Sequence, residues 1–513
     1  MNLVRALAST VRHNGPRPAL LDAERRYTWS EFGARVARAA GALAALGVVR
    51  GRRCAILARN GFRFEELKWA AFALGAVPVP VNFRLAPPEI AAILADCAAV
   101  RVLVETPFLA AFEHPALAPW RSRATEIGET AGAHAAAYET MLARAEPAVP
   151  ADPAPDEDAI LLYTGGTTGR SKGVRLTHAS ILSNAAAFGL GVGARREQVY
   201  LHAAPMFHSA DLLALGWFLQ GSAQAFLPAF TPPAFLDAIR RYRVGAVVTV
   251  PTMLIATVSD AAFAQADVSS LQILIYGAAP MAAEWIERVA RAFPDADLFN
   301  CYGLTETAPD LTIFDAREFR AAIASGDRAG PLASVGKPNV LNELRVAAPD
   351  GRELGPGEAG ELLARGPNIM AGYLNLPEET RAALRDGWLH TGDVARIDAA
   401  GYVYLLDRLK DVVITGGENV YSAEVEAVLH RHPAVAEAAV VGIPDERLGE
   451  AVMAVIVPRP GTRPSDQDLA HHCRESLGGF KVPRRFALVE RLPKSALGKV
   501  LKAELRKEFA SHG

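Results

Sequence analysis

The sequence predicts an α/β protein with a large N-terminal domain of layered α/β sheets and a smaller α+β C-terminal domain. The chain has 513 residues, which is more than one ordinary hydrophobic core accommodates, so at least two domains are expected. Helix-type and strand-type patterns alternate over the N-terminal part, as is typical of layered α/β domains. Beyond Gly401 the pattern changes to that of a small α+β unit of about a hundred residues.

The N-terminal alternation starts at Ser30, where apolar residues recur at helical spacing up to Leu46. Residues 53–57 then have the pattern of a buried strand. Further helices are expected at 65–74 and 87–97, and further strands at 77–81, 100–104, 159–163, 246–250 and 271–276. Ligands collect at the carboxyl ends of strands in open α/β sheets, so the turns that follow the last strands are expected to line a pocket.

The C-terminal unit has its own helix and strand signals. Ser422 can cap a helix that runs to about His430, and strands are expected at 436–441 and 451–457. Ser465 and Asp468 resemble a capping box that opens another helix.

Composition excludes several classes of protein. The chain carries 54 Lys and Arg against 56 Asp and Glu, which gives no sign of a nucleic-acid-binding surface. The four cysteines form no CxxC pair, so neither a zinc site nor a disulfide framework is expected, and a reduced cytoplasmic setting fits best. The N-terminus lacks the apolar core of a signal peptide, and residues 69–81 are too short and too broken for a transmembrane segment.

The most informative segment is a loop, residues 163–173, that follows a strand and has the sequence YTGGTTGRSKG. It is not a P-loop, because Ser171 and not glycine precedes the lysine. Its glycines let backbone amides approach an anion, its threonines add hydroxyl donors, and its lysine adds positive charge, which suits a polyphosphate better than a flexible surface loop. The residues concerned are Thr164, Gly165, Gly166, Thr167, Thr168, Gly169 and Lys172.

This loop closely resembles the phosphate loop of the adenylate-forming superfamily, which includes acyl-CoA synthetases, peptide-synthetase adenylation domains and luciferases. It departs from the usual pattern at Gly165, where Ser is more usual, and at Ser171, where Pro is usual. Six further segments agree with the same superfamily in the right order, so the resemblance extends over nearly the whole chain. They are residues 205–208 (PMFH), 276–280 (YGAAP), 302–307 (YGLTET), 391–393 (TGD), 407–411 (DRLKD) and 493–499 (PKSALGK).

The resemblance implies roles in nucleotide binding. Glu306 would hold Mg²⁺, a hard cation suited to carboxylate and phosphate oxygens. Thr305 would contact the AMP phosphate, and Asp393 and Arg408 would hold the ribose. The adenine would lie between Tyr302 and the turn after residue 276, with Gly277, Ala278, Ala279 and Gly303 as further contacts.

The resemblance also implies two conformations. Residues 410–513 would rotate about Lys410 relative to residues 1–409. In one conformation Lys499 would reach the substrate carboxylate and the α-phosphate. In the other, Gly416 and Gly417 would leave room for the pantetheine arm of coenzyme A, unless they form an ordinary hairpin turn.

His208 resembles the family's aromatic or histidine gate beside the acyl pocket, although a buried core histidine is the competing interpretation. The segments expected to line this pocket, 208–212, 250–253, 276–278 and 302–312, contain few charges apart from Asp211 and Asp310. They favour a monocarboxylic acid over a dicarboxylate or an amino acid.

The C-terminal tail is basic and is a candidate contact for the phosphates of coenzyme A, with a solvated basic face as the alternative. Residues 471–513 hold ten Lys or Arg and four Asp or Glu. The candidates are Arg474, Lys481, Arg484, Arg485 and Arg491.

We therefore expect an ATP- and Mg²⁺-dependent acid–thiol ligase. It would form an acyl-adenylate, with a medium- or long-chain fatty acid as the expected substrate, and transfer the acyl group to coenzyme A with release of AMP and pyrophosphate. The alternatives are an aromatic-acid CoA ligase, a stand-alone enzyme that loads a separate carrier protein, and a non-catalytic binding homologue. A homodimer is compatible with these readings.

Overall fold

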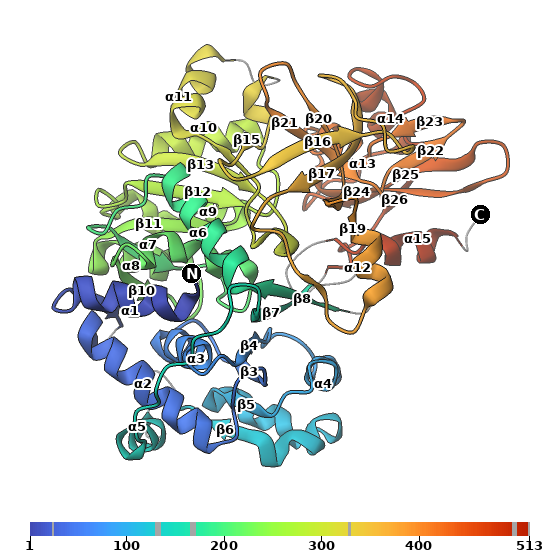
Figure 1. Ribbon diagram of the computed structural model, residues 1–513. Coiled ribbons are helices and arrows are strands. Elements are labelled where there is room, and N and C mark those ends of the chain that lie inside the picture. Colours follow the sequence, from blue (N-terminus) through green and yellow to red (C-terminus); the bar gives the residue numbers. More distant parts are fainter. Residues whose placement is uncertain (23–24, 129–134, 165–170, 327–329, 495–499, 511–513) are drawn as a thin grey trace.

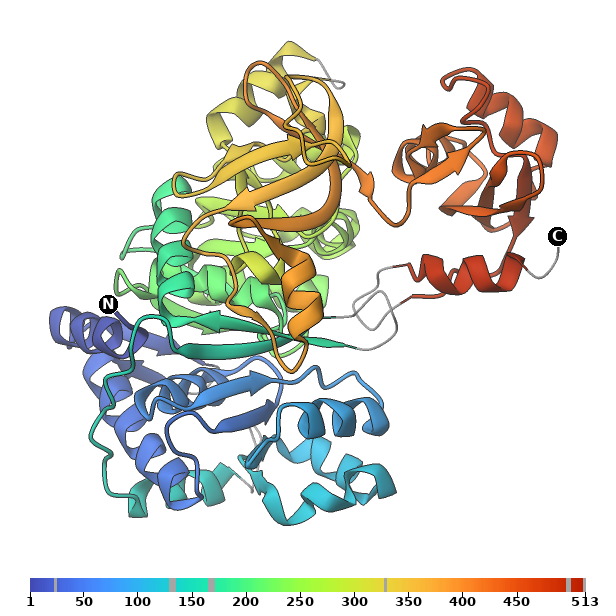
Figure 2. The same ribbon diagram turned by 45° about the vertical axis from the view of Figure 1, so that its right-hand side comes forward.

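The computed structural model describes residues 1–22, 25–128, 135–164, 171–326, 330–494 and 500–510. Helices and strands alternate through the N-terminal part of the chain (Figure 1), and Figure 2 shows the C-terminal unit standing to one side of it. This arrangement agrees with the α/β fold class predicted from the sequence.

The largest sheet has the strand order β15-β14-β13-β12-β11-β9-β10-β1-β2. Its central neighbours, from β13 to β1, are parallel, and its outer pairs are antiparallel. The carboxyl ends of β9, β11, β12 and β13 therefore meet at one edge, next to the segments expected to bind ligands. The strands are β1 (Pro18–Leu21), β2 (Arg26–Thr28), β9 (Val199–His202), β10 (Ala223–Phe226), β11 (Val244–Thr249), β12 (Ile273–Gly277), β13 (Asp297–Tyr302), β14 (Thr312–Phe314) and β15 (Lys337–Pro338).

Amphipathic helices cover this sheet. In α8 (Pro232–Tyr242), Thr231 caps the helix by accepting from the Ala234 amide, and the apolar side chains Phe235 and Ile239 are buried against the sheet. The other helices of this part are α6 (His178–Gly191), α7 (Leu215–Phe218), α9 (Pro251–Ser259), α10 (Ala283–Ala292) and α11 (Ala316–Ser325).

A second sheet, β4-β3-β5-β6, is parallel and confirms the first predicted alternation. Its strands are β3 (Arg53–Leu57), β4 (Val77–Pro80), β5 (Arg101–Val104) and β6 (Ala124–Glu126). Its helices are α1 (Leu3–Asn14), α2 (Trp29–Ala45), α3 (Phe62–Ala73), α4 (Pro87–Asp96) and α5 (Ala135–Arg144). Every residue of α3 is buried, including its charged side chains. Such a helix must pair its charges internally.

Two antiparallel sheets complete the N-terminal part, and the sequence analysis did not foresee most of their strands. The first contains β7 (Asp158–Thr164), β8 (Lys172–Thr177) and β18 (Gly372–Tyr373). The second contains β16 (Glu343–Ala347), β17 (Ala359–Arg365), β19 (Leu384–Arg385), β20 (Trp388–Ile397) and β21 (Val403–Arg408), with α12 (Pro377–Ala383) beside it.

The C-terminal unit has its own hydrophobic core between a sheet and helices, as expected of an α+β unit. The predicted capping box is confirmed, because Ser465 accepts from the Asp468 amide at the start of α14. The elements are β22 (Val413–Thr415), β23 (Glu418–Val420), α13 (Ser422–Leu429), β24 (Val435–Asp445), β25 (Gly449–Pro458), α14 (Asp466–Arg474), β26 (Arg485–Leu488) and α15 (Lys502–Ala510).

Two observations bear on the setting of the protein. Among the described residues, none of the helices combines the length and the apolar character needed to cross a membrane. Cys54, Cys97, Cys301 and Cys473 are free and buried, in agreement with the expectation that the cysteines form no disulfide framework.

Candidate active site

The predicted phosphate loop joins two paired strands. β7 and β8 are antiparallel, and Thr164 is the register partner of Lys172 at the end of the pair. The loop residues Gly165, Gly166, Thr167, Thr168 and Gly169, and likewise Lys499, lie outside the described residues. The structure therefore places the two ends of the loop.

Tyr373, which the sequence analysis missed, connects the end of this loop to Glu306. Its strand β18 pairs with β8. Its hydroxyl donates to Glu306 Oε1 at 2.8 Å, and the Lys172 ammonium lies 5.0 Å from the centroid of its ring. Burial, followed by the nearby Glu306 carboxylate, raises the pKa of Tyr373, so the hydroxyl stays protonated and acts as a donor. Lys172 and Glu306 are thus assembled around one side chain.

Thr305 and Glu306 lie in a tight 3-10 turn, η5 (Thr305–Thr307), that follows β13. The Met370 amide donates to the Glu306 carbonyl at 2.8 Å, and Thr305 Oγ1 donates to Ser209 Oγ at 3.2 Å. Gly303 has to be glycine, because a Cβ there would lie 1.8 Å from the Pro309 carbonyl oxygen.

The residues predicted to hold a ribose form a connected group. Asp393 on β20 and Arg408 on β21 are register partners, and Arg408 Nε lies 2.8 Å from Asp393 Oδ1. The Tyr302 hydroxyl donates to Asp393 Oδ2 at 2.5 Å. Asp393 is only 5% exposed, so these two donors fix the orientation of its carboxylate.

The predicted adenine contacts lie beside this group. Gly277 is the register partner of Cys301, next to Tyr302 on the adjacent strand. Ala278 has φ +66°, a left-handed conformation that is uncommon outside glycine. Ala278 and Ala279 are exposed. The structure thus brings an accessible turn next to the end of β13, which leads through Tyr302 to Thr305 and Glu306.

His208 caps the 3-10 turn η3 (Ser209–Ala214), and its Nδ1 accepts from the Ala210 amide at 3.4 Å. The side chain is partly exposed rather than buried, so the interpretation of His208 as a core histidine was wrong. Because Ser209 also contacts Thr305, η3 and η5 lie side by side.

The two acids noted near the acid-binding segments are both engaged inside the protein. Asp211 forms an ion pair with Lys68, at 2.5 Å, and a hydrogen bond with His202, at 2.8 Å. Asp310 accepts from Asn339 Nδ2 at 2.7 Å, and burial raises the pKa of its carboxyl group well above its usual range.

The chain on either side of Lys410 is tied to the C-terminal unit. Asp407 Oδ2 accepts from the Ser422 hydroxyl at 2.6 Å, and Arg506 Nη2 donates to Asp411 Oδ1. Burial lowers the pKa of Lys410; Asp411 opposes this shift, and Arg408, Arg506 and Lys502 add to it. Gly416 and Gly417 have φ +60° and +86° and connect β22 to β23, so the hairpin interpretation of this turn also holds.

Acidic partners hold part of the basic tail. Lys481 pairs with Glu424 at 2.7 Å, Lys494 with Glu437 at 2.6 Å, and Lys502 with Glu426 at 2.7 Å. Lys481 is thus engaged within its own domain, which weakens the hypothesis that it contacts the phosphates of coenzyme A.

Comparison with known families gives two matches. The model described as AMP-binding enzyme matches residues 7–374, and the model described as AMP-binding enzyme C-terminal domain matches residues 424–499.

Curated relatives and solved structures match over almost their full length. A feruloyl-CoA synthase of an Amycolatopsis species is 38% identical, covering 98% of this chain and 96% of the relative. The fatty acid–[acyl-carrier-protein] ligase ScoC of Streptomyces coeruleorubidus is 35% identical, covering 99% and 96%. The structure of o-succinylbenzoate CoA synthetase from Bacillus subtilis, in complex with its acyl-adenylate intermediate, is 30% identical, with a TM-score of 0.85 and coverage of 98% and 97%.

Proposed function

Because the chain belongs to the AMP-binding enzyme family and is an acid–thiol ligase of the acyl-CoA synthetase type, we propose that it joins a monocarboxylic acid with an uncharged far end to coenzyme A. The acid is first activated as its acyl-adenylate at the expense of ATP. The acyl group then passes to the thiol, and AMP is released.

One observation carries this proposal. The segment from Tyr302 to Glu306 connects the residue proposed to hold the ribose with those proposed to hold the phosphates. Tyr302 binds Asp393 at 2.5 Å, and Glu306 binds Tyr373 at 2.8 Å. A ribose held by Asp393 and phosphates held near Glu306 and Lys172 would therefore belong to the same nucleotide.

The chemistry requires positive charge where two anions meet. A carboxylate oxygen of the acid attacks the α-phosphorus, and pyrophosphate leaves. Lys172 would hold the outer phosphates, Thr305 would contact the α-phosphate, and Lys499 would stabilise the negative charge that develops there. Mg²⁺, when bound to Glu306, would neutralise phosphate charge, and the hard oxygen of a carboxylate suits it.

The second half-reaction replaces a phosphate by a thiol at the acyl carbon. The sulfur attacks that carbon, the bond to the AMP oxygen breaks, and the thiol proton is lost to solvent. We propose that residues 410–513 rotate about Lys410 between the two steps, so that Lys499 leaves and the turn at Gly416 and Gly417 approaches. His208 would open or close the route to the acyl carbon.

The proposed class of acid follows from the contacts of Asp211 and Asp310 in the segments expected to bind the acid. Asp211 and Asp310 are engaged by protein groups, so neither offers a free carboxylate to the ammonium group of an amino acid. A medium- or long-chain fatty acid fits such a site, and so does an aromatic acid, which the feruloyl-CoA synthase relative favours. The name of the ScoC relative keeps a separate carrier protein as a second candidate acceptor.

A panel assay separates these possibilities. Pyrophosphate release from ATP would be measured with dodecanoate, ferulate, benzoate and phenylalanine, each with coenzyme A, with a phosphopantetheinylated carrier protein, or with neither. We expect release with a fatty or aromatic acid, and thioester formation with coenzyme A. Activity with phenylalanine alone, or with the carrier protein alone, would refute the proposed acid or the proposed acceptor, respectively.

The role of Lys499 is tested with Lys499→Ala. We expect loss of acyl-adenylate formation by on the order of 100-fold or more, because one transition-state charge contact is removed. Conversion of a supplied acyl-adenylate to thioester should persist, since Lys499 is withdrawn in that step. Lys494→Ala, which removes a lysine paired with Glu437 at 2.6 Å, is the matched control. Equal loss of both half-reactions in Lys499→Ala would contradict the two-conformation scheme.

A further inference from the structure

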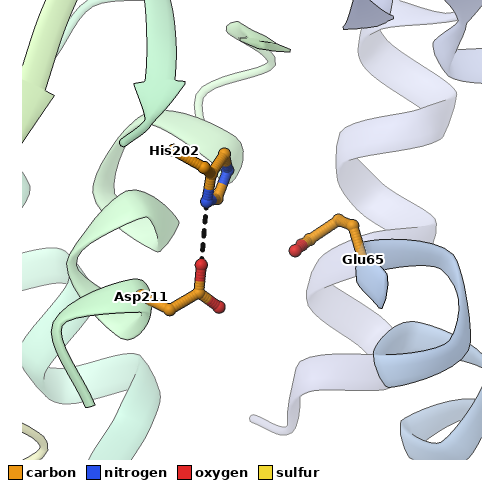
Figure 3. Close-up of side chains that lie close together, drawn as sticks. All are labelled: Glu65, His202 and Asp211. Carbon is orange, nitrogen blue, oxygen red and sulfur yellow. Dashed lines mark hydrogen bonds and ion pairs between the residues drawn. The ribbon is translucent and has the colours of Figure 1, made fainter. Parts of the chain in front are cut away.

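A buried cluster of four ionisable side chains includes Asp211, which lies in η3, the turn that His208 caps. Figure 3 shows Glu65 on α3 facing His202 and Asp211. The ligand atoms of these three residues lie within 4.8 Å of one another, as in a metal site. However, the Lys68 ammonium already lies between the carboxylates, 2.8 Å from Glu65 Oε2 and 2.5 Å from Asp211 Oδ2. A lysine thus supplies the cation in this cluster.

Hydrogen bonds hold His202 on both sides of its ring. His202 Nδ1 lies 2.8 Å from Asp211 Oδ1, and His202 Nε2 lies 3.1 Å from Gln224 Oε1. Gln224 donates its own amide to the Ser222 carbonyl, so its oxygen faces the histidine. Both ring nitrogens of His202 therefore face side-chain oxygens.

The Lys68 side chain remains charged. Burial lowers the pKa of Lys68, but Asp211 and Glu65 outweigh burial and raise it. Burial raises the pKa of Asp211, but Lys68 and His202 outweigh burial and lower it. The Lys68 ammonium thus offsets the charge of the carboxylates on either side of it, which is how charged groups are tolerated in a protein interior.

The segment that contains His208 is attached to α3 at two points, through Asn60 and through the Lys68–Asp211 pair of the cluster. Asn60, directly before α3, donates to the carbonyls of His202, at 3.0 Å, and Ala204, at 2.8 Å. It also accepts from the Met206 amide at 2.8 Å. Lys68, two turns into α3, binds Asp211 on the far side of His208. The chain from residue 202 to residue 211 is therefore held against α3 on both sides of His208.

Hydrogen bonds connect Asp211 to the proposed nucleotide site. The Asp211 amide donates to the His208 carbonyl at 3.0 Å, and the neighbouring Ser209 hydroxyl accepts from Thr305. A displacement of Asp211 would therefore move both His208 and the support of Thr305.

We propose that Lys68 and Asp211 are positioning residues for the acid-activating step: their ion pair fixes η3 on α3, and through η3 it sets His208 and Ser209 against Thr305. This inference rests on the proposed function, because it assigns the residues behind the acid site of that same reaction. Buried ion pairs add little net stability relative to apolar replacements, but they can impose one arrangement. Here that arrangement is the turn beside the acyl pocket.

The first test is Asp211→Asn, compared with Glu66→Gln. Glu66 is a matched control because it is buried on the same helix but pairs with Arg35 at 2.8 Å and Tyr138 at 2.9 Å. We expect Asp211→Asn to lower kcat/KM for the acid by about tenfold to 100-fold, since misplacing a positioned group by ~1 Å costs up to about 100-fold. KM for ATP should change much less. Glu66→Gln should change neither constant, even where both variants lose similar thermal stability.

The double variant Lys68→Met/Asp211→Asn covers the case in which the single variant does not fold. It removes one positive and one negative charge, so the net charge of the cluster does not change. It should fold and still show the loss in kcat/KM for the acid. Ferulate and dodecanoate serve as probes, whichever the wild type uses faster.

The outcomes separate this inference from the proposed function. A wild type that releases no pyrophosphate with any acid overturns both. An active wild type with unchanged kcat/KM in the double variant overturns the positioning role alone. Equal losses in Asp211→Asn and Glu66→Gln do the same, because they would reflect general destabilisation.

Discussion

The bond between Tyr302 and Asp393 can be tested quantitatively with Tyr302→Phe. The substitution removes one hydroxyl, which donates to a carboxylate at 2.5 Å, and keeps the ring that would lie against adenine. A hydrogen bond to a charged group contributes about 1.5–3 kcal/mol, and ~1.4 kcal/mol corresponds to a tenfold change in affinity. The expected rise in the dissociation constant for ATP is therefore about tenfold to 150-fold.

The lower end of this range is expected, because Arg408 still holds the other oxygen of Asp393 at 2.8 Å. The assay is ATP binding by calorimetry, repeated with 3′-deoxy-ATP. If Asp393 holds the ribose, the penalty of the substitution should shrink when a ribose hydroxyl is missing, since the two changes act on one interaction.

Tyr404→Phe provides the control for this experiment. Tyr404 on β21 donates at 3.1 Å to Asp398, which follows β20, so its loss reports any general effect of removing a tyrosine–aspartate bond from the hairpin of β20 and β21. An unchanged ATP affinity in Tyr302→Phe, or an equal penalty with ATP and 3′-deoxy-ATP, would refute the assignment of Asp393 to the ribose.

Two further predictions concern the backbone near Thr305 and the dependence of stability on pH. Gly303→Ala would place a Cβ 1.8 Å from the Pro309 carbonyl oxygen, so ATP–pyrophosphate exchange should fall by on the order of 100-fold, whereas Gly479→Ala, which meets no atom within 4 Å, should leave it unchanged. Burial lowers the pKa of His178 from 6.5 to about 4, with Glu157 opposing the shift. The unfolded chain therefore takes up this proton first as the pH falls. Stability should drop by up to ~3 kcal/mol between pH 6.5 and about 4 and no further below. Melting curves of His178→Gln should lose that part of the pH dependence, and those of the exposed His114→Gln should keep it.

The sequence predicted the N-terminal alternation well, because its strands and helices carry their own periodic signals. The buried strand at residues 53–57 is confirmed as β3, with the bounds Arg53–Leu57. Two-residue strands such as β18 and β19 were missed, since they exist only through pairing with strands distant in the sequence. Asp393 was recognised from a motif, whereas its strand β20 was not predicted.

The functional site shows the same contrast between residues that the sequence reveals and residues that only the structure reveals. Residues expected to contact ligands were found through motifs, whereas the residues that hold them were not. Tyr373 is 67 residues from Glu306, and Lys68 is 143 residues from Asp211. No local spacing in the sequence connects such partners, and only tertiary packing brings them together.

The four acids of the site differ in the donors that hold them, and the difference follows the charge that each location needs. Glu306 is held by the neutral hydroxyl of Tyr373, which orients the carboxylate and leaves its charge to attract a cation. Asp211 is paired with Lys68 and bonded to His202, and burial raises the pKa of Asp310 well above its usual range, which favours the uncharged carboxyl group. Asp393 shares its charge with Arg408 and accepts from Tyr302. Negative charge is thus kept where Mg²⁺ would bind and removed beside the segments that would receive a carboxylate, whose approach an unpaired acid would oppose.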